Sequence, residues 1–379
     1  MNTTIVISDV REAASCAHRL AIAPYLRCKE SLMPIVADEI AEHMNAQFRF
    51  DEPGFLARIP YKLTPTNLKG VYLNPTPPAD FDPRNASQMD LIKNGIMIRK
   101  PTAQDSPARR QAWDEYFAKK LLAKDRIVPQ FEVHLGKYHK LRSPVIKSTD
   151  GASWVSNAWA GAVTETGSWT TCIGTWKIPA VSKPSEAQGN EGGWNSSSWV
   201  GIDGWNDPSI SSNDVVQAGI EQRVSAAGVA SYQAWYEWYA PPVSNSPPYV
   251  WEVGISNMPV APGQSVSCTV QYTAHVSATI TFVNNTTGVH FSITLAPPPG
   301  ADFKGNTCEW IMEAPDGGEP TSSLPKFTPV VFTSAIGCGP NGATTNPAIS
   351  SITNIVNAQN VTLTRTTVGT DTTTTSFIG

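Results

Sequence analysis

The chain has 379 residues, with 28 Lys and Arg against 32 Asp and Glu and a net charge of −4. This length exceeds what one domain usually needs and is ample for a large core. The sequence has no apolar run of about 18 residues, which excludes a transmembrane helix. It also has no glycine-rich loop, zinc-finger spacing or interleaved aromatic stripe among its basic residues, so neither nucleic acid nor a membrane is expected as a partner.

Composition divides the chain near residue 150. Residues 1–150 hold 22 Lys and Arg against 17 Asp and Glu, a net of +5. Residues 151–379 hold 6 against 15, a net of −9, and eleven of the twelve Trp. The simplest interpretation is a basic region, 1–150, that docks on an acidic domain, 151–379.

The first part reads as mixed and mainly helical. Apolar residues at helical spacing predict helices over 9–28 and 29–48, and residues 50–85, rich in Pro, Asn and Asp, look irregular. Residues 107–124 predict a basic amphipathic helix, which either packs on its own domain or binds a partner. A basic strand over 131–142 then leads into a polar linker, 143–153.

After the linker, the pattern is all-β. Short runs rich in Val, Thr, Trp, Tyr and Ile alternate between apolar and polar residues and are separated by Gly, Pro, Asn and Ser. Strands are expected over 265–273, 278–283 and 290–295, and a closing hairpin over 361–378. This texture predicts an antiparallel β-sandwich.

Four segments of this second part place polar and aromatic side chains on common strand faces. In 234–239, Glu237 shares a face with Trp235 and Tyr239, and in 308–313, Glu309 shares a face with Glu313. Such a face is either simply solvated or a site for acid–base chemistry on an extended substrate. The four segments are Trp199–Gly204, Val216–Gly219, Ala234–Tyr239 and Cys308–Glu313.

Together with Asn157–Val163, these motifs resemble the glutamic peptidase (eqolisin) family, over about residues 155–379. The resemblance implies a sandwich of two large antiparallel sheets with a concave, substrate-binding cleft, and an acid-active endopeptidase that cleaves polypeptides. It implies that Gln217 and Glu309 form the catalytic dyad. By the same resemblance, the cleft is lined by Trp159, Trp199, Asp203, Glu237 and Tyr239.

The dyad suits peptide hydrolysis without a metal or a nucleophilic side chain, and we expect no cofactor. Glu309 would activate water as a base and then protonate the leaving nitrogen, while Gln217 orients the water and stabilises the oxyanion. A hydrogen bond from Gln217 or a hydroxyl would keep the pKa of Glu309 low enough for a base in acid. Glu313, four residues further on, is a rival for the role or a carboxylate near a strand end. No Gly-x-Ser-x-Gly or His-Glu-x-x-His motif supports a serine or zinc mechanism.

Two other functions remain open. A glycosidase could use Glu237 and Glu309 as its carboxylate pair, and a lectin-like sandwich could stack sugars on the same Trp face. Gln217 favours the peptidase, because a glycosidase needs no such glutamine. The chain departs from the family in its long loop between Asp203 and Gln217 and in Gln233 and Glu221, at positions that are often Asp.

The family implies secretion, although the first residues lack the basic and apolar regions of an ordinary signal peptide. A monomer is expected. The four cysteines after residue 150 (Cys172, Cys268, Cys308 and Cys338) allow three disulfide pairings, and free buried thiols are an equal alternative. The charge asymmetry suggests that residues 1–150 are a pro-segment that covers the acidic cleft at neutral pH, with a permanent accessory region as the rival interpretation.

Overall fold

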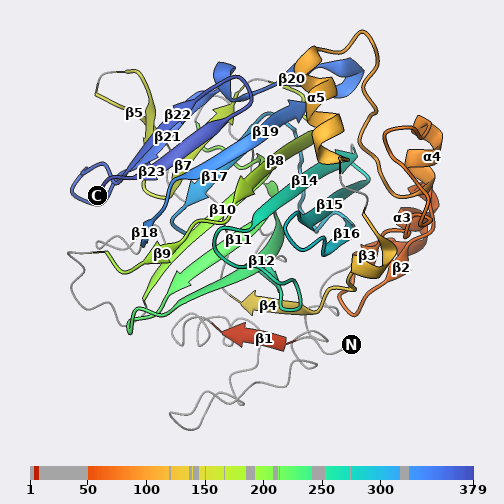
Figure 1. Ribbon diagram of the computed structural model, residues 1–379, viewed down its shortest axis with the longest axis horizontal. Coiled ribbons are helices and arrows are strands. Elements are labelled where there is room, and N and C mark those ends of the chain that lie inside the picture. The colour runs from red at the N-terminus through yellow and green to blue at the C-terminus, as the bar shows by residue number, and fades with distance from the viewer. Residues whose placement is uncertain are drawn as a thin grey trace.

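Two large β-sheets pack face to face and form most of the molecule (Figure 1). The computed structural model describes residues 4–7, 50–118, 121–135, 139, 145–149, 151–165, 167–184, 193–207, 212, 214–240, 252–273, 275–315 and 324–379. The predicted helices 9–28 and 29–48, together with Cys16 and Cys28, lie outside these residues. The all-β sandwich expected from the alternating pattern is confirmed.

The first sheet carries the segments singled out above. Its long central strands are antiparallel neighbours, and the two ends of the sheet are built from short strands, two of which come from the first 150 residues before the linker. In sheet order the described strands are β1 (Thr4–Ile7), β4 (Phe131–Leu135), β13 (Glu252–Ile255), β12 (Ala230–Tyr239), β11 (Val215–Val224), β10 (Trp194–Asp203), β17 (Cys308–Glu313), β7 (Trp159–Thr164), β21 (Ser351–Ile355), β6 (Trp154–Ser156) and β5 (Ile146–Lys147).

The second sheet matches the sequence prediction closely. The strands expected over 265–273 and 290–295 have those bounds, and the closing hairpin is formed by the last two strands of the chain. In order the strands are β2 (Thr64–Pro65), β3 (Val71–Leu73), β16 (His290–Leu295), β15 (Ser277–Asn284), β14 (Ser265–Thr273), β8 (Thr171–Lys177), β19 (Val330–Cys338), β23 (Thr373–Phe377) and β22 (Thr364–Val368). The short β20 (Thr344–Thr345) pairs with β19, and β9 (Val181–Ser182) pairs with β18 (Lys326–Phe327).

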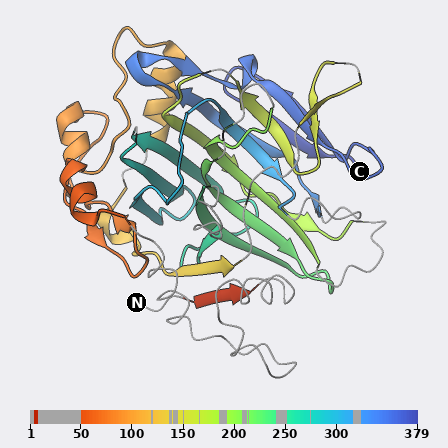
Figure 2. The same cartoon turned by 180° about the vertical axis from the view of Figure 1, so that it is seen from behind.

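The helical part of the chain covers one side and one end of the sandwich (Figures 1 and 2). The prediction of an irregular stretch over 50–85 is wrong in part, because it contains α3 (Glu52–Arg58), capped by Asp51, and the edge strands β2 and β3. The predicted helix 107–124 is shorter: α5 spans Pro107–Tyr116. The remaining helices are α4 (Gln88–Lys93), η1 (Ala123–Asp125), η2 (Pro340–Gly342) and η3 (Pro347–Ile349).

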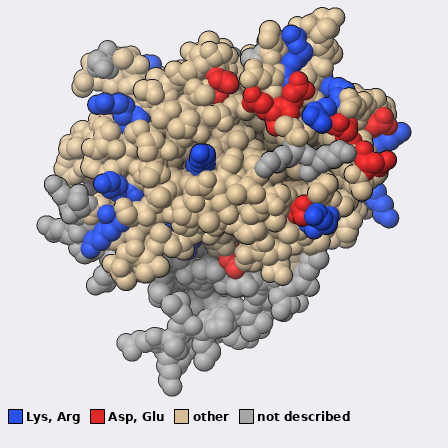
Figure 3. Space-filling model, in the orientation of Figure 1, with Lys and Arg blue, Asp and Glu red and all other residues tan. Residues whose placement is uncertain are grey.

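The helix α5 packs on its own molecule. Trp113 and Phe117 are buried against Ile173 of β8 and Ile336 of β19, on the outer side of the second sheet. This contact supports the simpler of its two interpretations. Figure 3 shows charged residues of both signs gathered over the helical region on the right, whereas the sandwich surface around it carries few.

The main core lies between the sheets. Inward-facing residues of the first sheet, such as Val200, Ile220 and Trp310, are fully buried in one cluster with Phe282 and Ile293 of the second. Cys172, Cys268, Cys308 and Cys338 are free and buried, so the thiol alternative holds and none of the three disulfide pairings forms. Trp176 and Trp194 also belong to this core.

The polar linker predicted over 143–153 is also wrong in part. Ile146 and Lys147 form β5 and pair with β6 at the edge of the first sheet. Both residues are exposed, so no pattern of buried and exposed positions predicts this strand from the sequence. Among the described residues, no helix has the length and apolar character needed to span a bilayer.

Candidate active site

The candidate site lies on the outer face of β12, β11, β10 and β17, the side turned away from the second sheet. We call it the cleft face and define it by Gln217, Glu237, Glu309 and Glu313. Strand period two brings them there, because the alternating residues of the same strands face the core. All four are at most 1% exposed, so the face is closed in this structure.

Gln217 and Glu309 flank one glycine. In the sheet register Gly201 of β10 pairs with Gln217 of β11 on one side and with Glu309 of β17 on the other. Two strand spacings of about 4.8 Å put their backbones about 10 Å apart. A Cβ on Gly201 would meet Trp199 at 2.8 Å and Gln217 at 3.1 Å, so glycine keeps the space between the two side chains open.

The Gln217 amide does not bond Glu309, which corrects the sequence expectation. Its Nε2 donates to a carboxylate oxygen of Glu237 and to the main-chain oxygen of His139, both at 2.8 Å. The Thr307 hydroxyl lies beside Glu309 and lowers its pKa, although no described residue makes a well-formed hydrogen bond to either carboxylate oxygen. Burial outweighs this effect and raises the pKa of Glu309 well above its usual range, which disfavours the charged carboxylate in this closed form.

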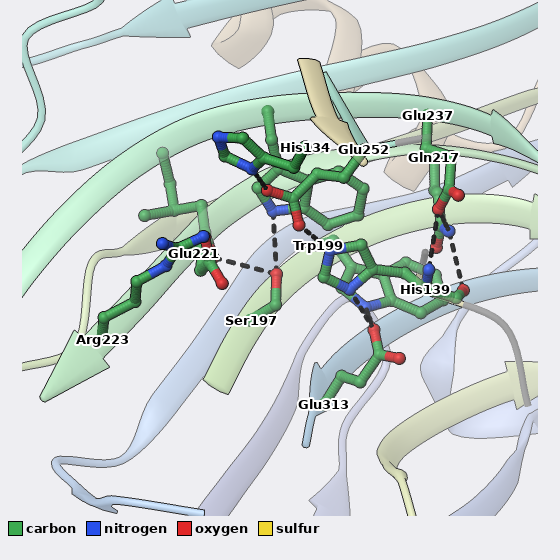
Figure 4. A network of polar contacts seen from close by, with 12 residues as sticks. His134, His139, Ser197, Trp199, Gln217, Glu221, Arg223, Glu237, Glu252 and Glu313 are labelled. Carbon is green, nitrogen blue, oxygen red and sulfur yellow. Dashed lines mark hydrogen bonds and ion pairs between the residues drawn. The ribbon is translucent and has the colours of Figure 1, made fainter. Parts of the chain in front are cut away.

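His139, from the basic stretch before the linker, closes the cleft face (Figure 4). Its backbone N–H donates to Glu237 at 2.9 Å, and its ring contacts Glu313 through Nδ1 at 2.9 Å and Glu252 of β13 through Nε2. The ring stacks on Trp235 with 3.9 Å between centroids and 10° between planes. Burial lowers the pKa of His139, but Glu313 and Glu252 outweigh it and raise the pKa to about 9.

The network of polar contacts continues into β4. Glu252 also contacts His134 Nδ1, and both side chains are buried. On Glu237, burial raises the pKa to about 8, although His139 acts in the opposite direction. Imidazoles from the first part of the chain thus meet carboxylates of the second part in a dry interface, where unpaired carboxylates would be costly.

The predicted tryptophans form the wall of this face. Trp159, Trp199 and Trp235 are fully buried in a separate cluster with Trp205 and Ile311. Trp159 meets Trp199 edge to face, with 4.8 Å between centroids. The indole nitrogens of Trp199 and Trp235 are hydrogen-bonded on this face, which fixes both rings.

Asp203 lies at the end of β10 and holds a loop. Its carboxylate accepts backbone N–H groups of Lys304, Gly305 and Asn306, just before β17. It thereby positions the strand that carries Glu309. Tyr239 ends β12 opposite Val215 and is 9% exposed. For both residues, contact with a substrate stays a prediction.

Glu313 lies on the cleft face but away from Gln217. It pairs in register with Ser197, four residues before Gly201 on β10, and its carboxylate accepts the Trp199 indole N–H at 2.7 Å. It is therefore partnered where Glu309 is not. Sequence reasoning did not single out Glu252, His139 or Gly201; for His139, the basic character of 131–142 was the available signal.

One group of described residues has ligand atoms close enough to consider a metal ion. His134, Glu221 and Glu252 offer atoms within 4.8 Å of one another. Arg223 lies 2.8 Å from Glu221, and Glu252 is shared by two imidazoles. Both arrangements compete with a cation for the same oxygens, and none of these residues belongs to the predicted dyad.

Comparison with known proteins identifies the family. The sequence model of the Peptidase A4 family matches residues 157–377. The class defined by the sandwich and its carboxylate–amide face is thus that of the glutamic peptidases, and this chain belongs to the Peptidase A4 family. It is an enzyme that acts on peptide bonds, and the resemblance found in the sequence is confirmed.

Two relatives are similar over much of the second part. Aspergillopepsin-2 of Aspergillus niger is 29% identical over 246 residues, which are 62% of this chain and 81% of that protein. Scytalidopepsin B of Scytalidium lignicola is 28% identical over 159 residues, which are 42% of this chain and 52% of that protein.

Among solved structures, a scytalido-glutamic peptidase with a transition-state analog inhibitor matches with a TM-score of 0.47 and 23% identity. The match covers 58% of this chain and 98% of that one. An aspergilloglutamic peptidase from Aspergillus niger matches with a TM-score of 0.41 and 29% identity, over 49% and 99% of the two chains.

Proposed function

We propose that the chain is an acid-active endopeptidase in which Gln217 and Glu309 activate water between them. The observation that carries this proposal is their placement: two side chains on either side of Gly201, on a face walled by indoles. A small reactant over Gly201 would lie within reach of both side chains, which general-base catalysis requires.

In the proposed mechanism, ionised Glu309 takes a proton from the water that attacks the substrate carbonyl. The Gln217 amide N–H donates to the oxyanion that develops. Glu309 then returns the proton to the leaving nitrogen as the peptide bond breaks. The closed form described above is unsuited to begin this sequence, because burial disfavours the charged form of Glu309 and the Gln217 amide donates to Glu237 and to the His139 carbonyl. Opening the face would admit water and lessen the desolvation of Glu309.

The glycosidase alternative fits the sheet less well. Glu237 and Glu309 are separated by β11 and β10, so their backbones lie three strand spacings, or about 14 Å, apart. Glycosidase carboxyl groups lie about 5 to 9.5 Å apart. Incubating the purified full chain with a denatured protein and with a β-glucan, from pH 2 to 7, tests the choice. We expect peptides from the protein and no sugar from the glucan; the reverse result would replace the proposal.

We further propose that residues 1–150 are a pro-segment whose His139 keeps the cleft face closed. The support is the burial of His139 among Glu237, Glu252 and Glu313, together with the net charges of +5 and −9 on the two parts. Protonation of Glu252 and Glu313 removes their attraction for the His139 imidazolium, so the segment loosens only at a pH low enough to protonate both carboxylates. The exposed stretch around Ile146 and Lys147 is then open to cleavage somewhere in 143–156.

The rival is a permanent accessory region, favoured by the strands that residues 1–150 add at one end of each sheet, among them β3 and β4. The test incubates the purified chain across the same pH series, then determines the new N-terminus. Trimming of wild type but not of Glu309→Gln, with Glu309→Gln trimmed once wild type is added, supports autoactivation. Full activity of an uncut chain contradicts it. In keeping with the family, we expect the mature peptidase to act outside the cell, on polypeptides and as a monomer.

A further inference from the structure

A pocket on the cleft face encloses the side chain of His139. Its floor is the Trp235 indole, on which the imidazole stacks at 3.9 Å between centroids. Glu313 contacts one ring nitrogen at 2.9 Å, and Glu252 contacts the other. His139, Trp235 and Glu252 are fully buried and Glu313 is 1% exposed, so the contacts are shielded from bulk solvent.

Each wall of this pocket is held by a second group. The Trp235 indole N–H donates to the Ser197 hydroxyl at 2.8 Å. The Trp199 indole N–H donates to Glu313 at 2.7 Å, and His134 contacts Glu252. Ser197 and Trp199 belong to β10, so at least the floor and one carboxylate stay in place without the first part of the chain. A pocket whose walls are fixed beforehand binds its occupant with less loss of entropy.

The chemistry of the pocket suits a flat cation. An indole face attracts a cation, and two carboxylates on opposite edges match the two N–H directions of an imidazolium or a guanidinium. A neutral side chain would leave two buried carboxylates without a counter-charge, which is costly. In agreement, burial lowers the pKa of His139 but the two carboxylates raise it to about 9, so the ring carries a charge at neutral pH.

The backbone of the same residue is held at the proposed catalytic groups. Gln217 donates to the carbonyl oxygen of His139, and Glu237 accepts its N–H. If Gln217 is the oxyanion donor, the carbonyl that it holds marks the position of a scissile carbonyl. The side chain in the pocket then belongs to the residue immediately before the cleaved bond.

We propose that Trp235, Glu252 and Glu313 form the subsite for the residue before the scissile bond, and that this subsite selects Arg or His in a substrate. The inference rests on the proposed function, because it uses the role of Gln217. His139 occupies the subsite as a substrate residue of this class would. Lys ranks below Arg, since an ammonium lacks the flat surface that stacks on Trp235.

The test uses one peptide scaffold with Arg, His, Lys, citrulline, norleucine or Glu before the cleaved bond. The full chain is first acidified until it hydrolyses a denatured protein, and kcat/KM is then measured at pH 5, where a substrate His is charged. Citrulline keeps the shape of Arg and removes the charge. We expect Arg to exceed citrulline by roughly 10²-fold, the range of a close charge pair.

Substitutions assign the preference to the pocket. Glu313→Gln and Glu252→Gln should each lower the ratio of Arg to citrulline at least about tenfold. Asp371→Asn, an exposed carboxylate in the turn between β22 and β23, should leave it unchanged. If wild type cleaves citrulline or norleucine peptides as fast as Arg peptides, the subsite inference is wrong while the proposed peptidase stands. If neither protein nor peptide is cleaved at any pH, both proposals fail together.

A second readout guards against misfolded variants. In the full chain, His139→Arg should keep the cleft closed at neutral pH, and His139→Leu should open it to limited proteolysis within 143–156. Equal protection of the two variants would contradict the charge preference.

Discussion

The two faces of β10, β11, β12 and β17 are equally buried, but different chemistry buries them. The inner face, with residues such as Ile220 and Trp310, packs against the second sheet and is apolar. The outer face carries Gln217, Glu237 and Glu309 and is closed by His139 of the same chain. The first kind of burial is favourable by itself, whereas the second costs free energy unless each charge has a partner. The outer face is therefore the one that can open and function.

The largest effect is expected from Gln217→Ala. Loss of the proposed oxyanion donor should lower kcat on a denatured protein by on the order of 10²- to 10³-fold without unfolding the chain. The matched control is Gln271→Ala, which removes a buried amide from β14 of the second sheet. If both variants lose activity equally, the outer face has no special role.

The next effect concerns closure of the outer face by His139. Its pKa is about 9 when docked and ordinarily 6.5, because Glu313 and Glu252 outweigh burial. As long as Glu313 and Glu252 stay ionised, the raised value means that docking has the full contribution of His139 below pH 6.5 and loses it as pH rises through 9. The loss corresponds to roughly 10²-fold in the docking equilibrium. Limited proteolysis of the linker between pH 6 and 10 measures it, and His139→Gln should show no such rise in cleavage.

A smaller effect is expected on the inner face. Ile220→Val removes one buried methylene and should lower the free energy of unfolding by about 1 kcal/mol, with kcat unchanged. Val361→Ala, at a residue 53% exposed, should change it by less than about 0.5 kcal/mol. Thermal unfolding with a parallel activity assay measures stability and turnover separately. If Ile220→Val also lowers kcat, the inner face is not purely structural, which contradicts the difference between the two faces.

No effect is expected from chelators, or from reagents that block serine, cysteine or aspartic peptidases. The proposed water activation belongs to a carboxylate and an amide, and neither needs a metal or a nucleophilic side chain. Activity lost to a chelator and restored by a divalent cation would direct attention to His134, Glu221 and Glu252 instead.

The sequence predicted the sheets and the cleft face well where strands are long. In β14 and β16 the side chains on one side of the strand face the core and those on the other side do not. The alternation of apolar and polar residues therefore predicts where each strand begins and ends. The short elements were not predicted. The helix α3 depends on its cap at Asp51, and β5 consists of two exposed residues. Neither leaves a periodic pattern.

The site was predictable as a set of strand faces but not as a network. Gln217 and Glu309 belong to motifs, and their placement beside Gly201 follows from strand order. The contacts of His139 with Glu252 and Glu313 join residues more than a hundred positions apart, and local patterns carry no information on them. For the same reason, of the two donors expected for Glu309, the Gln217 amide was wrong, since it donates to His139 and Glu237 instead, whereas the Thr307 hydroxyl does act on Glu309.

The most direct test of the outer face is to compare Glu309→Gln with Glu313→Gln on one denatured protein at the pH of highest activity. Both substitutions remove a buried carboxylate from the same face of β17 and nearly keep its shape, at positions four residues apart. The account predicts that Glu309→Gln loses at least about 10²-fold in kcat, and that the loss in Glu313→Gln is at least about tenfold smaller. Near-wild-type turnover of Glu309→Gln, with a larger loss in Glu313→Gln, would contradict the assignment and move the catalytic base to Glu313.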